Sequence, residues 1–161
     1  MYPVYTRCMF VKNVIEALNS ARIKYALVGG YAVALHGAIR GTVDLDFVIA
    51  LNKKQYTDFE KVMTELGLVS RLPVTADEVF NFRTEYIDNR NMIAWAFQNP
   101  DNPLEMIDVI ITHDASKMGT KTLVIDGMKL QIATIDELIQ MKKTSGRPQD
   151  VEDICALERL K

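Results

Sequence analysis

The pair Asp44 and Asp46 constrains this chain most, because both carboxylates lie in the apolar stretch 43–49, which alternates as a β-strand does. Side chains at positions i and i+2 of a strand point to the same face, so the two carboxylates project together, about 7 Å apart along the backbone. Two like charges beside a core are costly unless a positive charge lies between them, and Mg²⁺ binds carboxylate oxygens. The pattern favours a divalent-metal site. The alternative is an exposed pair that is solvated or paired with Arg40.

A pair of glycines, Gly29 and Gly30, follows the short apolar stretch 25–28 and precedes a segment that suits a short helix. Glycine permits unusual backbone dihedrals and close approach of a ligand, and free amides at the start of a helix bind phosphate. The alternative is a tight strand-to-helix turn without a ligand. This turn lacks the G-x-G-x-x-G fingerprint of dinucleotide-binding folds, and no P-loop pattern occurs in the chain.

The glycine pair and the Asp-x-Asp strand are far more specific together than either is alone. The stretch LVGG at 27–30, then thirteen residues, then DLDF at 44–47 resembles the signature of the nucleotidyltransferase superfamily related to DNA polymerase beta. The tripeptide RGT at 40–42 is similar to small members of that superfamily. Asp108, in the strand-like stretch 104–111, stands where a third carboxylate is expected.

The C-terminal part extends the resemblance. Residues 138–142 and the stretch GRPQD at 146–150, followed by Asp153, resemble the tail of AbiEii-like nucleotidyltransferases. Some of these are toxins of toxin–antitoxin systems. Many superfamily members have Gly-Ser in place of Gly29-Gly30, whereas Gly-Gly is common in the AbiEii-like branch. The resemblance covers about residues 24–50, 104–111 and 134–157.

The resemblance implies transfer of a nucleoside monophosphate from an NTP to a hydroxyl of RNA, a protein or a small molecule. Mg²⁺ or Mn²⁺ would be held by the carboxylates that also carry catalysis, namely Asp44, Asp46 and Asp108. The nucleotide would be bound by Gly29, Gly30, Arg40, Thr42, Lys142 and Arg147. A catalytically inactive module that binds NTP or metal and acts through an antitoxin-like partner protein is the second hypothesis. A plain interaction domain is the third.

Several of these residues also have a structural explanation. A turn-facing acid is the alternative for Asp108, and a solvated helix residue is the alternative for Lys142. Asp153 lies near the start of the last helix, where an acid interacts favourably with the helix dipole, and this role is favoured for it. Asp150 is left open because the tail pattern includes it. His36, on a short helix, favours packing or hydrogen bonding.

The order of expected elements predicts an α+β or mixed α/β class: a nucleotidyltransferase fold with a mixed central sheet flanked by helices. Residues 1–161 are expected to form one domain, with 134–161 as a short C-terminal helical pair. Periodicity and turn signals give helices over 7–21, 53–66, 134–143 and 148–160, and strands over 91–97, 104–111, 123–125 and 128–131. The stretch 69–90 mixes short apolar pieces with charges and carries no assignment.

Composition limits the cellular setting. The formal net charge of −2 and the pI of about 5.7 give no bulk signature of nucleic-acid binding. The first ten residues lack the pattern of a signal peptide, and no apolar run approaches the roughly 20 residues needed to span a bilayer. A cytoplasmic protein that does not bind membranes is expected. Cys8 and Cys155 lie in helix-like apolar patterns, which predicts two buried free thiols.

Overall fold

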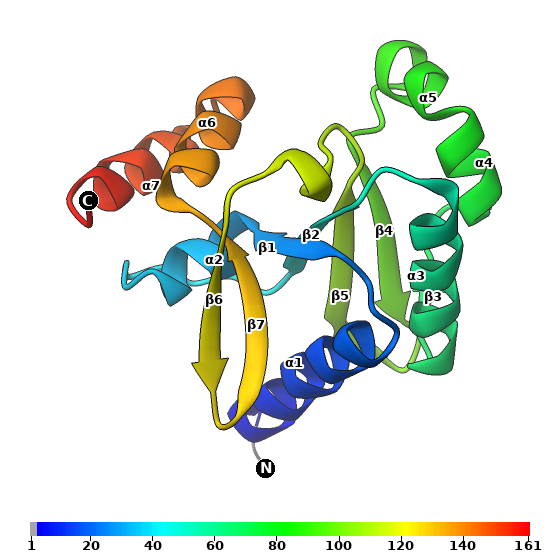
Figure 1. Cartoon of the computed structure of the whole chain (residues 1–161), viewed down its shortest axis with the longest axis horizontal. Helices are drawn as coiled ribbons and strands as arrows, with labels where there is room; N and C mark the ends of the chain where they lie inside the picture. Colours follow the sequence, from blue (N-terminus) through cyan, green and yellow to red (C-terminus); the bar gives the residue numbers. More distant parts are fainter. Residues whose placement is uncertain (1–2) are drawn as a thin grey trace.

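The computed structural model describes residues 3–161, with side chains from Arg7 onward (Figure 1). Among the described residues, no helix is both long and apolar enough to cross a membrane. The helices are α1 Pro3–Ser20, α2 Gly29–Leu35, α3 Lys53–Glu65, α4 Ala76–Asn81, α5 Arg83–Arg90, the 3₁₀ helix η1 Ala115–Lys117, α6 Ile135–Ser145 and α7 Pro148–Glu158. The strands are β1 Tyr25–Val28, β2 Leu45–Ile49, β3 Val69–Ser70, β4 Ala94–Asn99, β5 Asn102–Ile110, β6 Thr120–Ile125 and β7 Met128–Ala133.

The strands form one seven-stranded sheet in the order β3-β4-β5-β2-β1-β7-β6. Strand β2 pairs in parallel with β5, and β1 pairs in parallel with β7, whereas the other neighbours are antiparallel. Parallel pairs need long crossover connections, and the chain supplies one between β2 and β5 that contains α3, α4 and α5. The predicted mixed sheet flanked by helices is confirmed.

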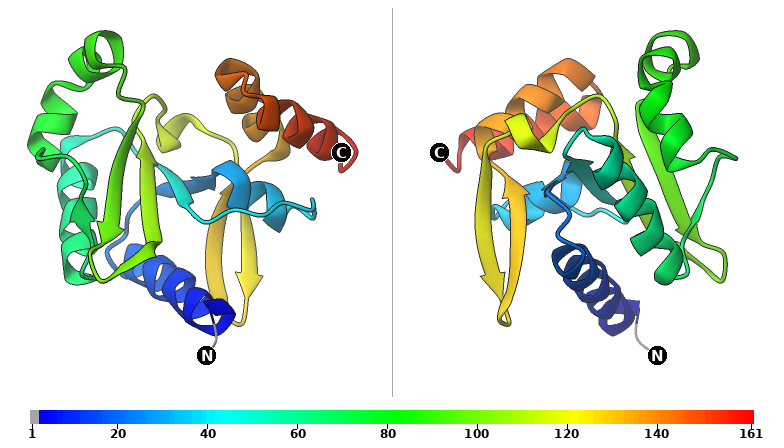
Figure 2. Two further views of the ribbon diagram at one scale, coloured as in Figure 1. Left: turned by 180° about the vertical axis from the view of Figure 1, so that it is seen from behind. Right: turned by 45° about the vertical axis from the view of Figure 1, so that its right-hand side comes forward.

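The two faces of the β4–β5 half of the sheet differ sharply in burial. Trp95 and Phe97 point to the face covered by α3, where Trp95 stacks on Tyr56 and Phe97 meets Phe59 edge-on. All four rings are at most 2% exposed, so this face forms the core. On the opposite face the alternate side chains are only partly buried, and Figure 2 (left) shows no helix lying over β4 and β5 there. That uncovered face is called the open face below.

The other half of the sheet is arranged around the glycine turn. Strand β1 is buried along its whole length, and α2 follows it without an intervening loop. Helices α6 and α7 form the predicted C-terminal pair and both pack against α2 (Figure 1). Residues after α2 run as an irregular segment from His36 to Asp44 before entering β2. The glycine turn, that segment and the helical pair are thereby brought together.

Several sequence predictions need correction. Cys8 and Cys155 are exposed, because the apolar stripes of α1 and α7 turn other side chains inward, among them Val14 and Leu157. The predicted strand 91–97 begins only at Ala94, because Asn91 adopts a left-handed conformation (φ 51°) and caps α5. The unassigned stretch 69–90 forms β3, α4 and α5, elements of two to eight residues that are too short to show clear periodicity.

Candidate functional site

The sheet register brings the predicted carboxylates together. Asp46 in β2 and Asp108 in β5 are direct partners of the parallel pair, so their side chains share one face of the sheet. That face is the open face, because Ile107 and Val109 beside Asp108 are both fully buried on the other side. Asp44 lies two residues before Asp46, just outside β2. These three residues are called the strand aspartates.

The strand aspartates are unpaired. Within residues 7–161, no hydrogen bond or ion pair reaches any of the three carboxylates. Burial, followed by the charges of Asp108 and Asp44, raises the pKa of Asp46 to about 7, while the charges of Arg147 and Lys142 oppose that shift. Burial and then the charge of Asp44 raise the pKa of Asp108. The site therefore holds more negative charge than its protein surroundings balance.

The glycine turn lies directly against Asp46. Val28, the last residue of β1, is the antiparallel partner of Asp46, so Gly29 begins the turn beside that carboxylate. Gly29 has φ +68°, and a Cβ at this position would stand 2.0 Å from Oδ2 of Asp46. Both the left-handed conformation and the contact exclude any other residue without rearrangement. The turn and the Asp-x-Asp strand thus form one structural unit, as their joint spacing in the sequence indicates.

Gly30 lies against the segment that leads into β2. A Cβ on Gly30 would stand 3.0 Å from Cβ of Thr42 and 3.3 Å from Cζ of Arg40. Arg7, in α1, also stabilises this segment. It donates one hydrogen bond to the carbonyl oxygen of Thr42, at 2.9 Å, and another to the carbonyl oxygen of Val43. A serine at position 30 would crowd this packing. Close approach to Thr42 and Arg40 is therefore the physical reason for a second glycine here.

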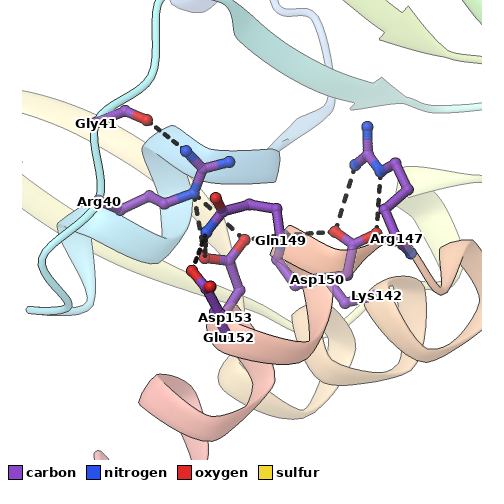
Figure 3. A network of polar contacts seen from close by, with 8 residues as sticks. All are labelled: Arg40, Gly41, Lys142, Arg147, Gln149, Asp150, Glu152 and Asp153. Carbon is purple, nitrogen blue, oxygen red and sulfur yellow. Dashed lines mark hydrogen bonds and ion pairs between the residues drawn. The ribbon is translucent and has the colours of Figure 1, made fainter.

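A buried ionic network joins this segment to the helical pair (Figure 3). Nζ of Lys142, in α6, lies 2.6 Å from Oδ2 of Asp153 and 3.3 Å from Oδ1 of Asp150, both in α7. Nε of Arg40 lies 3.1 Å from Oδ1 of Asp153, and Nε of Arg147 lies 3.0 Å from Oδ2 of Asp150. Asp150 and Asp153 are called the helix-pair aspartates.

The network bears on the structural explanations considered for Lys142 and Asp153. Lys142 is 6% exposed and ion-paired, so it is not a solvated helix residue. Asp153 is structural, but it acts through Lys142 and Arg40 rather than through the helix dipole. Burial alone would raise the pKa of Asp150, yet hydrogen bonds from Arg147, Ser145 and Lys142 lower it overall. Because Arg40 pairs with Asp153, it is not the partner of the strand aspartates.

One charged residue that lies near the site is not identified from the sequence. Arg71 follows β3, and its backbone N–H donates to the carbonyl oxygen of Ala96 at 2.9 Å. Ala96 is in turn the antiparallel partner of Asp108, and the charge of Arg71 lowers the pKa of that carboxyl against the larger effect of burial. The only available signal was the alternation of Val69, Ser70 and Arg71, which is too short to interpret.

The strand aspartates fit a hard divalent cation by their chemistry, since they offer carboxylate oxygens and lack a protein partner. Their present side-chain positions do not form a finished coordination shell. Among residues 7–161, no group of three or more His, Cys, Asp or Glu side chains is close enough to hold a metal ion. Two surface hollows, of about 310 and 260 Å³, lie away from these carboxylates, around His36 and around Tyr25 respectively.

Comparisons with known proteins bear on the fold. No family profile matches the chain, and no curated protein matches its sequence. Its fold is similar to the solution structure of the antibiotic-resistance factor ANT(2'')-Ia, with a TM-score of 0.64 and 12% identity over 95% of this chain and 83% of that one. The crystal structure of ANT(2'')-Ia with adenylyl-2''-tobramycin gives a TM-score of 0.61 and 12% identity over 94% and 87% of the two chains.

A third similar structure comes from Thermotoga maritima and is provisionally assigned as a nucleotidyltransferase. Its TM-score is 0.60, with 12% identity over 100% of this chain and 96% of that one. The similarity extends over nearly all of both chains, so it includes the sheet, the glycine turn and the helical pair. The chain therefore has the nucleotidyltransferase fold.

Proposed function

We propose that this protein is a metal-dependent nucleotidyltransferase that moves a nucleoside monophosphate from an NTP to an acceptor hydroxyl. The observation that carries the proposal is the contact between the glycine turn and Asp46, with Asp108 in register beside it. A turn with close backbone access and a set of unpaired carboxylates meet at one place on the sheet. Phosphoryl transfer requires positioning and electrostatic stabilisation more than covalent chemistry, and this arrangement can supply both.

In this proposal the strand aspartates hold Mg²⁺ or Mn²⁺. When bound, such ions would supply positive charge that stabilises the negative charge developing on the transferred phosphoryl group. Asp44 and Asp46 would serve both ions. Asp108 would serve the acceptor side, where its raised pKa suits it to accept the proton of the attacking hydroxyl.

The nucleotide is assigned to the opposite side of Asp46. The amides of Gly29 and Gly30 would face the β- and γ-phosphates, and Thr42 packs directly against this turn. Arg40 and Arg147 reach the network from its two ends and are 23% and 73% exposed in their side chains, so both can turn a guanidinium toward phosphate. The ammonium of Lys142 is already engaged, and it would act through its charge on Asp46.

The finer assignment follows the C-terminal pattern. The helical pair and its Lys142–Asp150–Asp153 network occupy the tail that resembles AbiEii-like nucleotidyltransferases, so we place the chain in that branch with a toxin-like role. The cytoplasm is the proposed location, because a reducing compartment keeps the exposed Cys8 and Cys155 as thiols. RNA, a protein side chain and a small molecule all remain acceptors to be tested.

A second function is favoured by one observation. Lys142, Arg40 and Arg147, the cations assigned to the nucleotide, are all ion-paired with the helix-pair aspartates, which is compatible with a catalytically inactive module acting through an antitoxin-like partner protein. Such a module would bind NTP without transferring it. The two functions differ in one measurable respect, namely the appearance of labelled product.

The deciding experiment incubates the pure protein with each α-labelled NTP, Mg²⁺ or Mn²⁺, and total cellular RNA. Asp46→Asn serves as the site variant, and Asp58→Asn serves as the control because Asp58 lies on α3, where it pairs with Lys54. Label that appears on RNA or on the protein, and that is lost only in Asp46→Asn, establishes the enzyme. Metal-dependent NTP binding without transfer supports the inactive module, and the absence of both refutes the two functions together.

A further inference from the structure

The direction from which an acceptor reaches the site follows from the proposed function, on which this inference rests. In an in-line displacement the attacking oxygen and the leaving pyrophosphate lie on opposite sides of the α-phosphorus. The glycine turn is assigned to the pyrophosphate, and it lies on the β1 side of Asp46. The acceptor must therefore arrive from the β5 side, across the open face of β5 and β4 (Figure 2, left).

The open face offers a low floor next to Asp108. Ala96 is the direct cross-strand partner of Asp108, and Ala94 and Met106 flank it on the same face. These side chains are half-buried, and Figure 2 (left) shows no helix over β4 and β5 on this face. A molecule bound on this part of the open face would contact apolar side chains and backbone, and the carboxylate beside it would be that of Asp108.

A cation stands at the far edge of that floor. Ser70 faces the core, where it accepts a hydrogen bond from Nε1 of Trp95 at 3.2 Å, so strand alternation places the side chain of Arg71 on the open face. Arg71 is exposed, and within residues 7–161 its guanidinium has no ion-pair partner. Two strand spacings separate its backbone from that of Asp108, which is about 10 Å. Its charge acts on Asp108 across this gap.

We propose that the acceptor carries an anionic group, a phosphate or a carboxylate, which Arg71 binds while the acceptor hydroxyl lies at Asp108. The hydroxyl oxygen forms a bond to the α-phosphorus, and the bond from that phosphorus to the bridging oxygen of the β-phosphate breaks. Pyrophosphate leaves with the electron pair, and the hydroxyl proton passes to the Asp108 carboxylate. A guanidinium suits this role because its planar fork binds either anion in two-point fashion.

Hydroxyl compounds that share a three-carbon skeleton but differ in charge test this preference. Glycerol 3-phosphate and glycerate carry the two anions, glycerol is neutral, and 3-amino-1,2-propanediol is cationic. With labelled NTP and Mg²⁺, we expect transfer to the anionic compounds at lower KM than to glycerol, and least transfer to the cation. The two anions separate a phosphate site from a carboxylate site.

Variants of Arg71 locate the preference. Arg71→Gln should raise the KM for the preferred anion about tenfold or more, as expected for a lost charged hydrogen bond, while leaving the Kd for NTP unchanged. Arg71→Glu should turn the preference toward the cationic compound. Lys61→Gln is the matched control, because it removes one positive charge from α3, on the covered face of the sheet, and should change neither value.

A binding measurement makes the inference independent of turnover. In the presence of Mg²⁺ and saturating NTP analogue that cannot react, glycerol 3-phosphate should shift the amide resonances of Arg71 and Ala96, and glycerol should not. Equal KM values for anionic and neutral acceptors, unchanged KM in Arg71→Gln, or no shift at these amides would each overturn the inference. Failure of the wild-type protein to bind NTP would instead refute the proposed function itself.

Discussion

The helix-pair aspartates and the strand aspartates are all partly or fully buried. The two sets differ in whether cationic side chains pair with them. Each helix-pair aspartate is almost fully buried and is met by Lys142 together with an arginine. The strand aspartates have no such partners among residues 7–161, and burial together with the charges of Asp108 and Asp44 raises the pKa of Asp46 to about 7. The protein itself neutralises the helix-pair aspartates, whereas the strand aspartates would be neutralised by the proposed divalent cation.

This contrast offers a physical test of the proposal that the strand aspartates are functional and the helix-pair aspartates are structural. Removing one partner from a buried ion pair is costly, whereas removing one charge from a set of unpaired like charges relieves repulsion. Substitutions in the two sets should therefore change stability in opposite directions. The predictions below run from the largest expected change to the smallest.

Lys142→Met should cost about 3 to 5 kcal/mol of the free energy of unfolding, because it leaves two buried carboxylates without their shared cation. Urea denaturation followed by tryptophan fluorescence of Trp95 measures it. Lys143→Met, the exposed neighbour on α6, is the control and should change stability little. A Lys142→Met protein as stable as wild type would mean that Arg40 and Arg147 alone can neutralise the helix-pair aspartates.

Gly29→Ala should cost about 2 to 4 kcal/mol and abolish metal and NTP binding, because the new Cβ occupies the place of the Asp46 carboxylate. Gly37→Ala is a matched control, since Gly37 also has positive φ (+110°) but a Cβ there would meet only Leu160, at 3.9 Å. The control should cost about 1 kcal/mol and keep binding. Equal effects of the two changes would show that backbone strain, and not the contact with Asp46, causes the loss of stability and binding.

Asp46→Asn should stabilise the metal-free protein by about 2 to 4 kcal/mol at pH 8, since a tenfold change in proton affinity is worth about 1.4 kcal/mol. The pKa of Asp46 is raised by folding from 3.8 to about 7, so this group destabilises the fold increasingly between pH 3.8 and 7 and by a constant amount above pH 7. Below pH 3.8 both states hold the proton, and the gain from asparagine should shrink toward zero as the pH falls from 7 to 4. Thermal unfolding at several pH values measures this, and a destabilised Asp46→Asn at pH 8 would contradict it.

Metal affinity should rise about tenfold between pH 6 and pH 8, because an acid of pKa about 7 is mostly protonated at the lower pH and mostly ionised at the higher one. Calorimetric titration with Mn²⁺ in two buffers of different ionisation enthalpy measures both the affinity and the proton released. Asp46→Asn should lose the pH dependence. Affinity that is flat across this range would place the ion away from Asp46.

Much of the fold could be predicted because its signals are local. The strand 25–28, the glycine turn and the hairpins around Asn99 and Asp126 each depend on neighbouring residues, and they form where expected. Thr134 caps α6 as the capping pattern at 134–137 predicts. The stretch 69–90 failed for the complementary reason, since its elements are held by contacts with β4 and α3 rather than by their own periodicity.

The sequence could predict which carboxylates the candidate site contains, a prediction that still awaits experiment, but it could not predict their contacts. Spacing identified Asp44 and Asp46, and the resemblance pointed to Asp108, yet no pattern could show that these carboxylates lack partners. Nor could it show that Lys142 lies between two aspartates eight and eleven residues later, because that contact depends on how α7 folds back on α6. Arg71 was invisible for the same reason, since only the β3–β4 pairing places it.

The pairing of Asp46 with Asp108 has a consequence for protein synthesis. These partners are separated by 62 positions (108 − 46), and α3, β3, α4, α5 and β4 lie between them. A nascent chain that has released β1, the glycine turn and β2 already carries two of the three carboxylates, but it lacks the strand that completes the set. The site is therefore assembled late in translation, and a prematurely ended chain would contain its most recognisable sequence pattern without the chemistry.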